Sequence, residues 1–320
     1  MKFKTLFLLF SITLIFFLGI LVILPYYMLG TSYSETFWRT NWPLLLVWVF
    51  LFIGMNAFYF TNRRLFTLLE KEDWPALVRY LEDKVIQRGR YSPRLVRLLA
   101  NSYLVLSDSA GVMSLENKTA MVKPGLVDAN ALVFGTARIL GKDISGAVHF
   151  FENRKDTAKP AVREWMRWYH GFALLLDRQY ERAGDEFSLL ARVSGDGVIT
   201  ALSSYFLSES LALVLPEKFS EFREISSTGK KRVLDALPRQ KNWQREVSSL
   251  STEIHAAALL KYMGETGKWL YEERSAAEPD RFPELNHFLE EKPEQDEGEG
   301  PRSLSGFALF HEENAKKRSF

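Results

Sequence analysis

Arginine and tryptophan residues gather in one short stretch of the chain, at Arg163, Trp165, Arg167 and Trp168, with Phe172 one helical turn later. These residue types supply much of the binding energy in protein interfaces, because they combine a large apolar area with directional polar groups. We predict that the five residues form a groove that binds a peptide or helical segment of a protein partner. Aromatic residues at helical spacing also form buried stripes, so a role in the core is the alternative interpretation.

Sequence patterns typical of enzymes are missing. The Gly-Lys pairs at Gly141, Gly229 and Gly267 lack the upstream glycine and the downstream Ser or Thr of a phosphate-binding loop. The histidines are not spaced as metal ligands, and no serine stands in a G-x-S-x-G turn. The chain has no cysteine, which excludes disulfides and thiolate metal sites. We predict a protein that is not an enzyme and that has no cofactor, metal ion or small-molecule substrate.

Positive and negative charges are nearly balanced, with 41 Lys and Arg against 39 Asp and Glu. Such a chain presents no overall basic field, so nucleic acid is not an expected partner. A local basic cluster occurs at Lys84, Arg88, Arg90 and Arg94. We interpret it as a solvated helix face, with contact to anionic lipid headgroups as the alternative.

Two apolar segments near the N-terminus, at about 5–25 and 43–61, each contain at least 18 consecutive uncharged residues. A helix rises about 1.5 Å per residue, so each segment is long enough for the roughly 30 Å hydrocarbon core. Pro43 is expected in the first turn of the second helix. Asn56 is expected near the interface or in a hydrogen bond between the two helices. The sequence thus predicts a two-helix transmembrane hairpin over 1–62, in contact with the lipid bilayer.

The basic residues that flank these segments predict an orientation. Two precede the first span, one lies in the predicted loop over 30–42, and three follow the second span: Lys2, Lys4, Arg39, Arg63, Arg64 and Lys71. Since Lys and Arg favour the cytoplasmic side, we expect a two-pass protein of the bacterial inner membrane with both termini in the cytoplasm. A cleaved signal peptide is the alternative for the first segment. Its apolar stretch exceeds the usual length of about 7–15 residues, and no A-x-A site follows.

The rest of the chain has helical periodicity and repeats itself. When the sequence is shifted by 36 residues, identical residues align in pairs: Gly135 and Gly171, Ala137 and Ala173, Leu140 and Leu176, Ala147 and Ala183, Phe151 and Phe187. Small residues let two helices cross closely, and a large apolar residue fills the space between neighbouring repeats. A repeat of this length is typical of helical solenoids.

These residues resemble the tetratricopeptide repeat (TPR) family. The stretch 168–187 has Gly171, Tyr180, Ala183 and Phe187 at the positions of the TPR motif, and 127–160 is similar, with Ile144 at the turn position. The resemblance implies packing between repeats for seven residues: Gly135, Ala147, Phe151, Gly171, Tyr180, Ala183 and Phe187. It also implies that the helix carrying Trp165 and Trp168 lines a concave groove. The second helix of a more degenerate copy is expected over 73–81, and the first helix of the next copy over 92–108, with Pro93 at its start.

We therefore expect an all-α fold, in which the N-terminal two-helix transmembrane hairpin is followed by a TPR-like α-solenoid. The expected regions are a hairpin, repeats, a C-terminal helical cap and a disordered acidic tail, over 1–62, 63–215, 216–289 and 290–320. Within the cap, helices are predicted over 217–225, 230–237, 243–263 and 266–277. The tail carries a short apolar motif over 303–310, which is part of a disordered end or, alternatively, docks on a partner or on this chain's own groove.

These expectations predict a non-enzymatic, membrane-anchored scaffold or adaptor that recruits protein partners. The layout is similar to the membrane-anchored TPR family associated with late haem biosynthesis in bacteria, a resemblance of architecture that implies fold more than role. One alternative is an accessory subunit of an envelope assembly, such as the flagellar motor or a cell-envelope biogenesis complex. Another is an enzyme or transport accessory with a site in the helices after Pro216.

Overall fold

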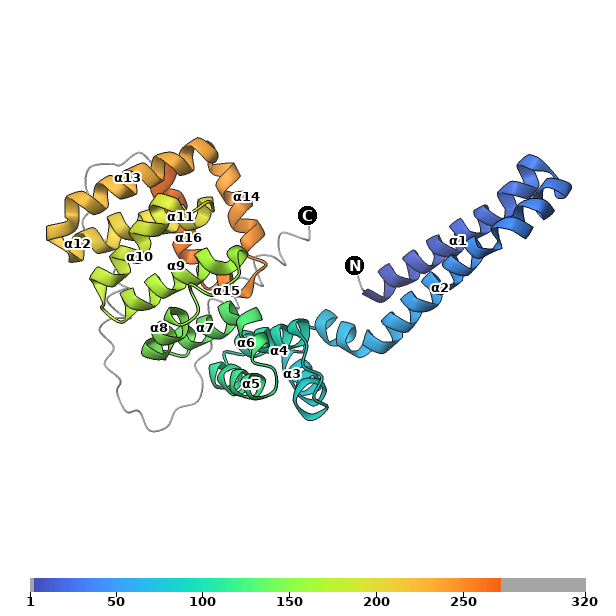
Figure 1. Cartoon of the computed structure of the whole chain (residues 1–320), viewed down its shortest axis with the longest axis horizontal. Coiled ribbons are helices and arrows are strands. Elements are labelled where there is room, and N and C mark those ends of the chain that lie inside the picture. Colours follow the sequence, from blue (N-terminus) through green and yellow to red (C-terminus); the bar gives the residue numbers. More distant parts are fainter. Residues whose placement is uncertain (1–2, 272–320) are drawn as a thin grey trace. The chain divides into compact units, whose positions relative to one another are not determined.

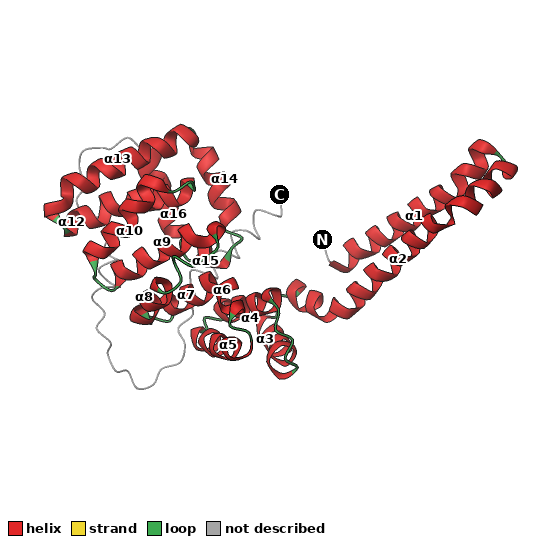
Figure 2. Cartoon of the chain, viewed as in Figure 1, coloured by secondary structure: helices red, strands yellow, loops and turns green. Residues whose placement is uncertain are grey.

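The computed structural model describes residues 3–271, and all regular structure in this range is helical, with no strand (Figure 2). The chain divides into two compact units, Met1–Arg88 and Gly89–Phe320. The predicted all-α class is therefore confirmed for the described part of the chain. The predicted tail over 290–320, with its apolar motif, lies outside the described residues.

The first unit begins with a hairpin of two long helices, α1 (Phe3–Leu29) and α2 (Thr31–Glu70), which pack against each other (Figure 1). The only residue between them is Gly30, whose φ of 79° lies in the left-handed region that glycine adopts without strain. Both helices are long and apolar enough to span a membrane. Many of their large apolar side chains are exposed, such as Phe16 at 65% and Phe50 at 69%, as expected for surfaces that face lipid.

The structure corrects the predicted start of the second span. The segment 30–42 is not a loop, because α2 begins at Thr31 and continues unbroken through Pro43 to Glu70. Its 40 residues correspond to a length of about 60 Å, which is roughly twice the hydrocarbon core. The domain boundary expected at 62/63 is therefore also wrong, since it falls inside this helix.

Contacts within the hairpin are mostly apolar. Phe7 of α1 stacks on Tyr59 of α2, with ring centroids 3.8 Å apart. The Asn56 side-chain amide donates to the carbonyl of Phe52 at 2.9 Å, which lies one turn earlier in the same helix. Asn56 thus satisfies its amide within α2, and the predicted alternative of a bond to the other helix is not observed.

The first unit ends with α3 (Trp74–Glu82) and a π-helical turn over Asp83–Gln87. The Asp73 carboxylate caps α3 by accepting from the Ala76 N–H at 3.1 Å. Leu77, Leu81 and Val85 are completely buried, because they share one face of the helix. This buried face holds α3 and the π-helical turn together as one amphipathic segment.

The second unit is a succession of helices (Figure 1). Their bounds are α4 (Pro93–Val105), α5 (Ser109–Val122), α6 (Gly125–Ala129), α7 (Ala131–Leu140), α8 (Ile144–Glu152), α9 (Pro160–Leu176), α10 (Tyr180–Val193), α11 (Gly197–Phe206), α12 (Ala212–Val214), α13 (Phe219–Ala236), α14 (Gln240–Leu250), α15 (Ile254–Ala257) and α16 (Leu260–Tyr271). A π-helical turn over Leu207–Leu211 joins α11 to α12, and a 3₁₀ turn over Pro216–Lys218 leads into α13.

One turn geometry recurs along the chain. Glu72, Ser107, Lys142 and Arg178 all have positive φ, between 54° and 62°, and each joins two helices. In each case its N–H and the N–H of the next residue bond back to carbonyls in the last turn of the preceding helix, at 2.9–3.2 Å. This is the Schellman arrangement that ends a helix. The spacing of 35, 35 and 36 residues shows that the repeat extends beyond the two copies with identical residues.

Side-chain caps strengthen the same turns. The carboxylates of Asp73, Asp108 and Asp143 each accept a hydrogen bond from the N–H three residues later. The following helices therefore begin at equivalent positions, with Ile144 and Tyr180 as the first residues of α8 and α10. The pairs α4–α5, α7–α8 and α9–α10 in the second unit are thus built to one local design.

The helix pairs pack in sequence order. The helix α9 contacts its own partner α10 and also α7 and α8, while α11 contacts α10, α13 and α9. The segment Gly197–Val214 is apolar enough to qualify as a third candidate membrane span, but most of it is buried by these neighbours. In this structure it is a core helix of the second unit. Since α11 packs on α13, the expected division at 215/216 separates two helices that belong together.

The C-terminal helices differ from the predicted ones. The helices expected over 217–225 and 230–237 are one helix, α13, because Gly229 is accommodated inside it with Ser204 against its backbone. The single helix expected over 243–263 is instead broken into α14, α15 and the start of α16. The helix expected over 266–277 is the second half of α16, and its residues after Tyr271 are not described.

Candidate functional site

Five aromatic side chains of α9 and α11 point to one side of the second unit: Trp165, Tyr169, Phe172, Tyr205 and Phe206. We call them the aromatic face. Phe206 packs edge to face with Phe172 and Tyr205, at centroid distances of 5.8 and 5.7 Å, and Trp165 contacts Tyr169 at 6.2 Å. Trp168 lies beneath them, in contact with Phe172, Phe206 and the α10 residue Phe187.

The aromatic face is covered by α15 and α16 (Ile254–Tyr271), which we call the cover. His255 packs against Trp165 and Tyr169 with ring centroids 5.5 and 5.8 Å away. Tyr262 contacts Phe172 and Phe206 at 5.7 and 5.4 Å. Trp269 meets Tyr205 at 5.9 Å. In Figure 1, α15 lies beside α9 and α7, and α16 lies against α11, in agreement with these contacts.

A few hydrogen bonds accompany these ring contacts. The Tyr169 hydroxyl donates to the backbone carbonyl of His255 at 2.7 Å, and the Tyr205 hydroxyl donates to the Glu265 carboxylate at 3.2 Å. At the far end of the cover, the Lys230 ammonium donates to the carbonyl of Trp269. The Tyr271 hydroxyl also donates to the carbonyl of Leu237. The cover is therefore bound at both ends and near its middle.

Burial changes the acid–base properties of these groups. Desolvation and, secondarily, the positive charge of Arg97 lower the pKa of His255 to about 4, so His255 is neutral at pH 7. Burial and the neighbouring Glu265 carboxylate raise the pKa of Tyr205, and burial raises the pKa of Tyr169. Both tyrosines therefore keep their protons and act as hydrogen-bond donors to the cover.

The structure corrects the predicted partner-binding groove. Trp168 is fully buried, and Trp165 and Phe172 are only 7% and 6% exposed, so none of the three is open to a partner in this structure. The alternative interpretation, in which aromatic residues at helical spacing form the core, describes all three. The two arginines, Arg163 and Arg167, do not join them in one surface.

The two arginines instead hold the linker between α8 and α9. Arg163 is exposed and donates to the carbonyl of Ala158 at 3.2 and 3.3 Å. Arg167 pairs with Asp156 and lies 3.6 Å from the Glu186 carboxylate. Their contacts are therefore with their own chain, and they fix the start of α9.

A buried ionic cluster lies around the same linker. The Glu186 carboxylate of α10 pairs with the Lys155 ammonium and is 3.1 Å from Nδ1 of His170, which is 1% exposed. Burial alone would raise the pKa of Glu186, but hydrogen bonds from His170 and Lys155 outweigh it and lower the pKa to about 2. The charges compensate one another, so the cluster fastens the linker to α9 and α10.

The residues predicted to pack between repeats lie at the crossings of α7 with α8 and of α9 with α10. A Cβ added to Gly135 would lie 2.2 Å from the Phe151 ring, and a Cβ added to Gly171 would lie 3.1 Å from the Phe187 ring. Ala147 and Ala183 are completely buried in the second helices of the two pairs. Tyr180 is half-buried as the first residue of α10. The same contact between a glycine and a phenylalanine thus closes both pairs.

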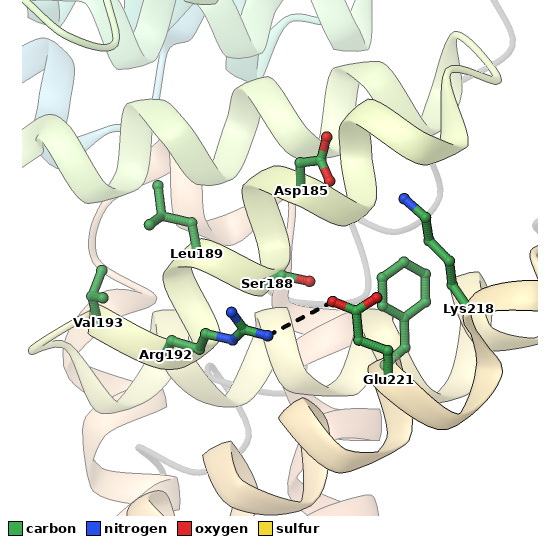
Figure 3. A pocket seen from close by; sticks show the side chains of 8 residues that line it. Asp185, Ser188, Leu189, Arg192, Val193, Lys218 and Glu221 are labelled. Atoms are coloured by element: carbon green, nitrogen blue, oxygen red, sulfur yellow. Dashed lines mark ion pairs between the residues drawn. The ribbon is translucent and has the colours of Figure 1, made fainter.

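Figure 3 shows a shallow hollow of about 420 Å³ between α10 and α13. Asp185, Arg192, Lys218 and Glu221 project around it, with Arg192 and Glu221 pointing toward one another at 3.7 Å. These side chains are exposed or partly exposed to solvent, and ion pairs in such positions contribute little to stability. Across residues 3–271, no three His, Asp or Glu side chains gather as metal ligands. The hollow therefore lacks the desolvated groups of a reaction centre.

The residues that complete the covered site were not predicted: Tyr205, His255, Tyr262, Glu265 and Trp269. Tyr262 and Trp269 are seven residues apart and so lie on one helix face, which is a signal present in the sequence. The predicted helix boundaries at 263 and 266 separated them. Their counterparts on α9 and α11 are far away in the sequence, since Tyr169 and His255 are 86 residues apart.

Comparison with known proteins places this chain in one family. A family model described as "Uncharacterised Treponema protein" matches residues 111–272, which is half of the chain and includes α6 through α16. An "Uncharacterized protein" of Treponema pallidum (strain Nichols) is 33% identical over 189 residues, and the match covers 59% of this chain and 58% of that relative. The chain thus spans less than two thirds of the relative that it matches. No solved structure matches. The chain belongs to the family described as "Uncharacterised Treponema protein".

Proposed function

We propose that this protein is a non-enzymatic, membrane-anchored scaffold, whose helical domain holds a segment of a protein partner at the membrane. The observation that carries the proposal is the covered aromatic face. It already binds a helix, since α16 lies on α9 and α11 through Tyr262 and Trp269. A surface of this kind recognises an amphipathic helix by its apolar side chains.

We also propose that the helix pairs are of the tetratricopeptide type. The recurring turns at Ser107, Lys142 and Arg178 and the contact of Gly171 with Phe187 support this proposal. Stacked pairs of this kind produce an extended surface that suits a peptide or helix. The layout of a two-helix anchor followed by repeats remains similar to the haem-biosynthesis-associated membrane TPR family. An accessory role in another envelope assembly is compatible with the same architecture.

The proposed location is the bacterial inner membrane, with both ends of the chain in the cytoplasm. The basic residues Arg63, Arg64 and Lys71 after the apolar part of α2 support this orientation. The chain has no cysteine, so a single introduced one is its only thiol. In intact cells, an impermeant maleimide is expected to label Thr31→Cys beside the hairpin turn and to leave Ser227→Cys in α13 unlabelled. The reverse pattern would overturn the orientation.

The rival proposal is an enzyme or transport accessory with a site in the C-terminal helices. A hollow of about 450 Å³ lies between α14 and α16. Its lining is largely apolar and amide-bearing, including Trp243 and Met263, and Lys268 is its one ionisable side chain. General acid–base chemistry needs a positioned pair of titratable groups, so this lining favours the scaffold over the rival.

Site-specific photocrosslinking in cells tests the proposal. A photoreactive aromatic residue is placed at Trp165 on α9 or at Tyr205 on α11, both of which belong to the aromatic face, with the exposed Ser227 on α13 as the control. The expected result is one discrete crosslinked protein at the first two positions and none at the control. If folded, membrane-inserted protein crosslinks to no protein at any of these positions, the scaffold proposal fails.

A further inference from the structure

We propose that the aromatic face is a receptor for amphipathic helices, that α16 is its resident ligand, and that a partner helix with the same side-chain pattern takes the place of α16. This inference rests on the proposed scaffold function and specifies the partner. The partner is a helix, defined by the chemistry that α16 displays to the aromatic face.

The side chains of α16 define the recognition pattern. Tyr262 and Trp269 are seven residues apart and contact the aromatic face at Phe172, Phe206 and Tyr205. Met263 and Leu270 are also buried, but Met263 lines the hollow toward α14. The two residues in contact with the aromatic face are seven positions apart, as anchor residues on one face of a bound helix are. The expected partner helix therefore carries two aromatic residues seven positions apart.

One polar contact adds specificity to this pattern. The Glu265 carboxylate, three residues after Tyr262, accepts the hydrogen bond of the Tyr205 hydroxyl. Because burial and Glu265 raise the pKa of Tyr205, this hydroxyl stays a donor. A helix that lacks an acceptor at this position forgoes this hydrogen bond to a buried hydroxyl, which weakens its binding. The partner helix should therefore carry a carboxylate three residues after its first aromatic residue.

The helix α16 is poorly suited to stand alone. It has 12 residues, and two of them are Gly264 and Gly267. Isolated helices of this length are marginal in water, and each glycine weakens them further. Gly264 has no packing reason to be glycine, since a Cβ there would meet nothing within 4 Å. Glycine at position 264 therefore makes α16 a less stable helix than alanine would, although the packing would accept alanine. This favours the displacement of α16 by a competing helix.

The other side of α16 is incompletely packed. The hollow of about 450 Å³ separates part of α16 from α14, with Gly264 and Lys268 on its lining. The Thr266 hydroxyl is buried without a hydrogen-bond partner. Both features lower the free energy that holds α16 in place. The cover is therefore able to open while the helix pairs remain folded.

Hydrogen exchange of the full chain in lipid nanodiscs tests this independence. We expect the amides of α16 to exchange at least tenfold faster than those of α9 and α11, through a local opening that depends little on denaturant. If α16 instead exchanges together with α9 and α11, at the same rate and with the same denaturant dependence, it is an inseparable part of the core. The inference is then wrong.

A glycine replacement tests the role of α16 as a competitor. Gly264→Ala adds a methyl group into open space and is expected to slow exchange in α16 about fourfold, since alanine favours the helix. Binding of a fluorescent peptide of residues 258–271 should weaken by a similar factor. The control is Gly195→Ala, where a Cβ also meets nothing within 4 Å but lies outside any helix, and which should change neither quantity. Equal effects of both variants would count against the inference.

The reverse experiment loosens the cover. In the double variant Tyr262→Ala, Trp269→Ala, the labelled peptide should bind at least tenfold more tightly than to the unmodified chain. A peptide with both aromatic residues replaced by alanine should not bind. Two outcomes overturn the inference: the peptide fails to bind although α9 and α10 keep their slow exchange, or α9 and α10 lose that protection. Peptide binding in nanodiscs without any protein crosslink in cells would instead retain the receptor and refute the scaffold function.

Discussion

The helix pairs and the cover both bury aromatic rings, but different contacts hold them. In the pairs, Phe151 packs against Gly135 and Phe187 packs against Gly171, and each contact joins residues only 16 positions apart. The two helices of each pair are connected by a tight turn whose N–H groups bond to carbonyls of the preceding helix. In the cover, His255 contacts Tyr169, which is 86 residues earlier in the sequence. The helix α16 also contains Gly264, where an added Cβ would meet no atom within 4 Å. The pairs are therefore locally determined units, whereas the cover depends on a surface that the pairs must form first.

The largest expected difference is between two tryptophans. Trp168→Ala empties the completely buried centre of α9 and should cost about 3–5 kcal/mol of unfolding free energy. Trp269→Ala removes a half-buried ring of the cover and should cost less than half as much. Chemical denaturation of the detergent-solubilised chain, followed by circular dichroism, measures both. A Trp168→Ala variant of unchanged stability would restore the groove interpretation of this residue.

The glycine contacts separate the two regions next. Gly135→Ala places a methyl group 2.2 Å from the ring of Phe151, which is fully buried and cannot move away, so a loss of about 3 kcal/mol is expected. Gly171→Ala meets Phe187 at 3.1 Å and should be milder. Thermal unfolding compares the two, with Gly195→Ala as the control. Equal stability of all three variants would contradict the proposed close helix crossing.

Acid is expected to destabilise the contact between the cover and the helix pairs at His255. His255 has a folded pKa of about 4 against about 6.5 in the unfolded chain, so protonation favours unfolding. The contribution of this residue to the free energy of unfolding is complete above about pH 6.5 and is lost progressively between about pH 6.5 and 4. At pH 5 the loss amounts to about 2 kcal/mol. Unfolding of the full chain at pH 7.5 and pH 5 measures the loss.

The variant His255→Asn separates this effect from the other buried titration. Glu186 has its folded pKa lowered to about 2, so its contribution is lost only as the pH falls below about 4.5. The difference between pH 7.5 and 5 should therefore shrink in the His255→Asn variant, which has no titrating side chain at this position. An unchanged difference would show that His255 is not its source.

The smallest effect concerns the turns. Ser107 is exposed and holds a φ of 59°, a conformation that costs an L-residue about 1 kcal/mol relative to glycine. Ser107→Gly should therefore stabilise the α4–α5 pair by about 0.5 kcal/mol, after the extra entropy of glycine in the unfolded chain is subtracted. Denaturant titration detects this change, and destabilisation would contradict the assigned turn geometry.

Sequence patterns predicted what is local. The start of α4 at Pro93 after Ser92, the glycine–phenylalanine contacts and the apolar N-terminal helices all follow from residues close in the chain. The turn at Ser107 could not be predicted, because a non-glycine residue adopts the left-handed conformation there. Pro43 was expected to begin a helix, yet the hairpin continues α2 through it. The cover could not be predicted, because its partners lie on helices far away in the sequence.

The unbroken course of α2 has a mechanical consequence. In the proposed membrane-spanning arrangement, α2 is a rigid helix about 60 Å long that starts at the hairpin turn, crosses the bilayer and ends at Glu70. Transmembrane helices adjust their tilt to the thickness of the lipid around them. A change of about 10° in the tilt of α2 would move Glu70 by about 10 Å relative to Gly30. Changes in membrane thickness would thereby become displacements at the beginning of α3.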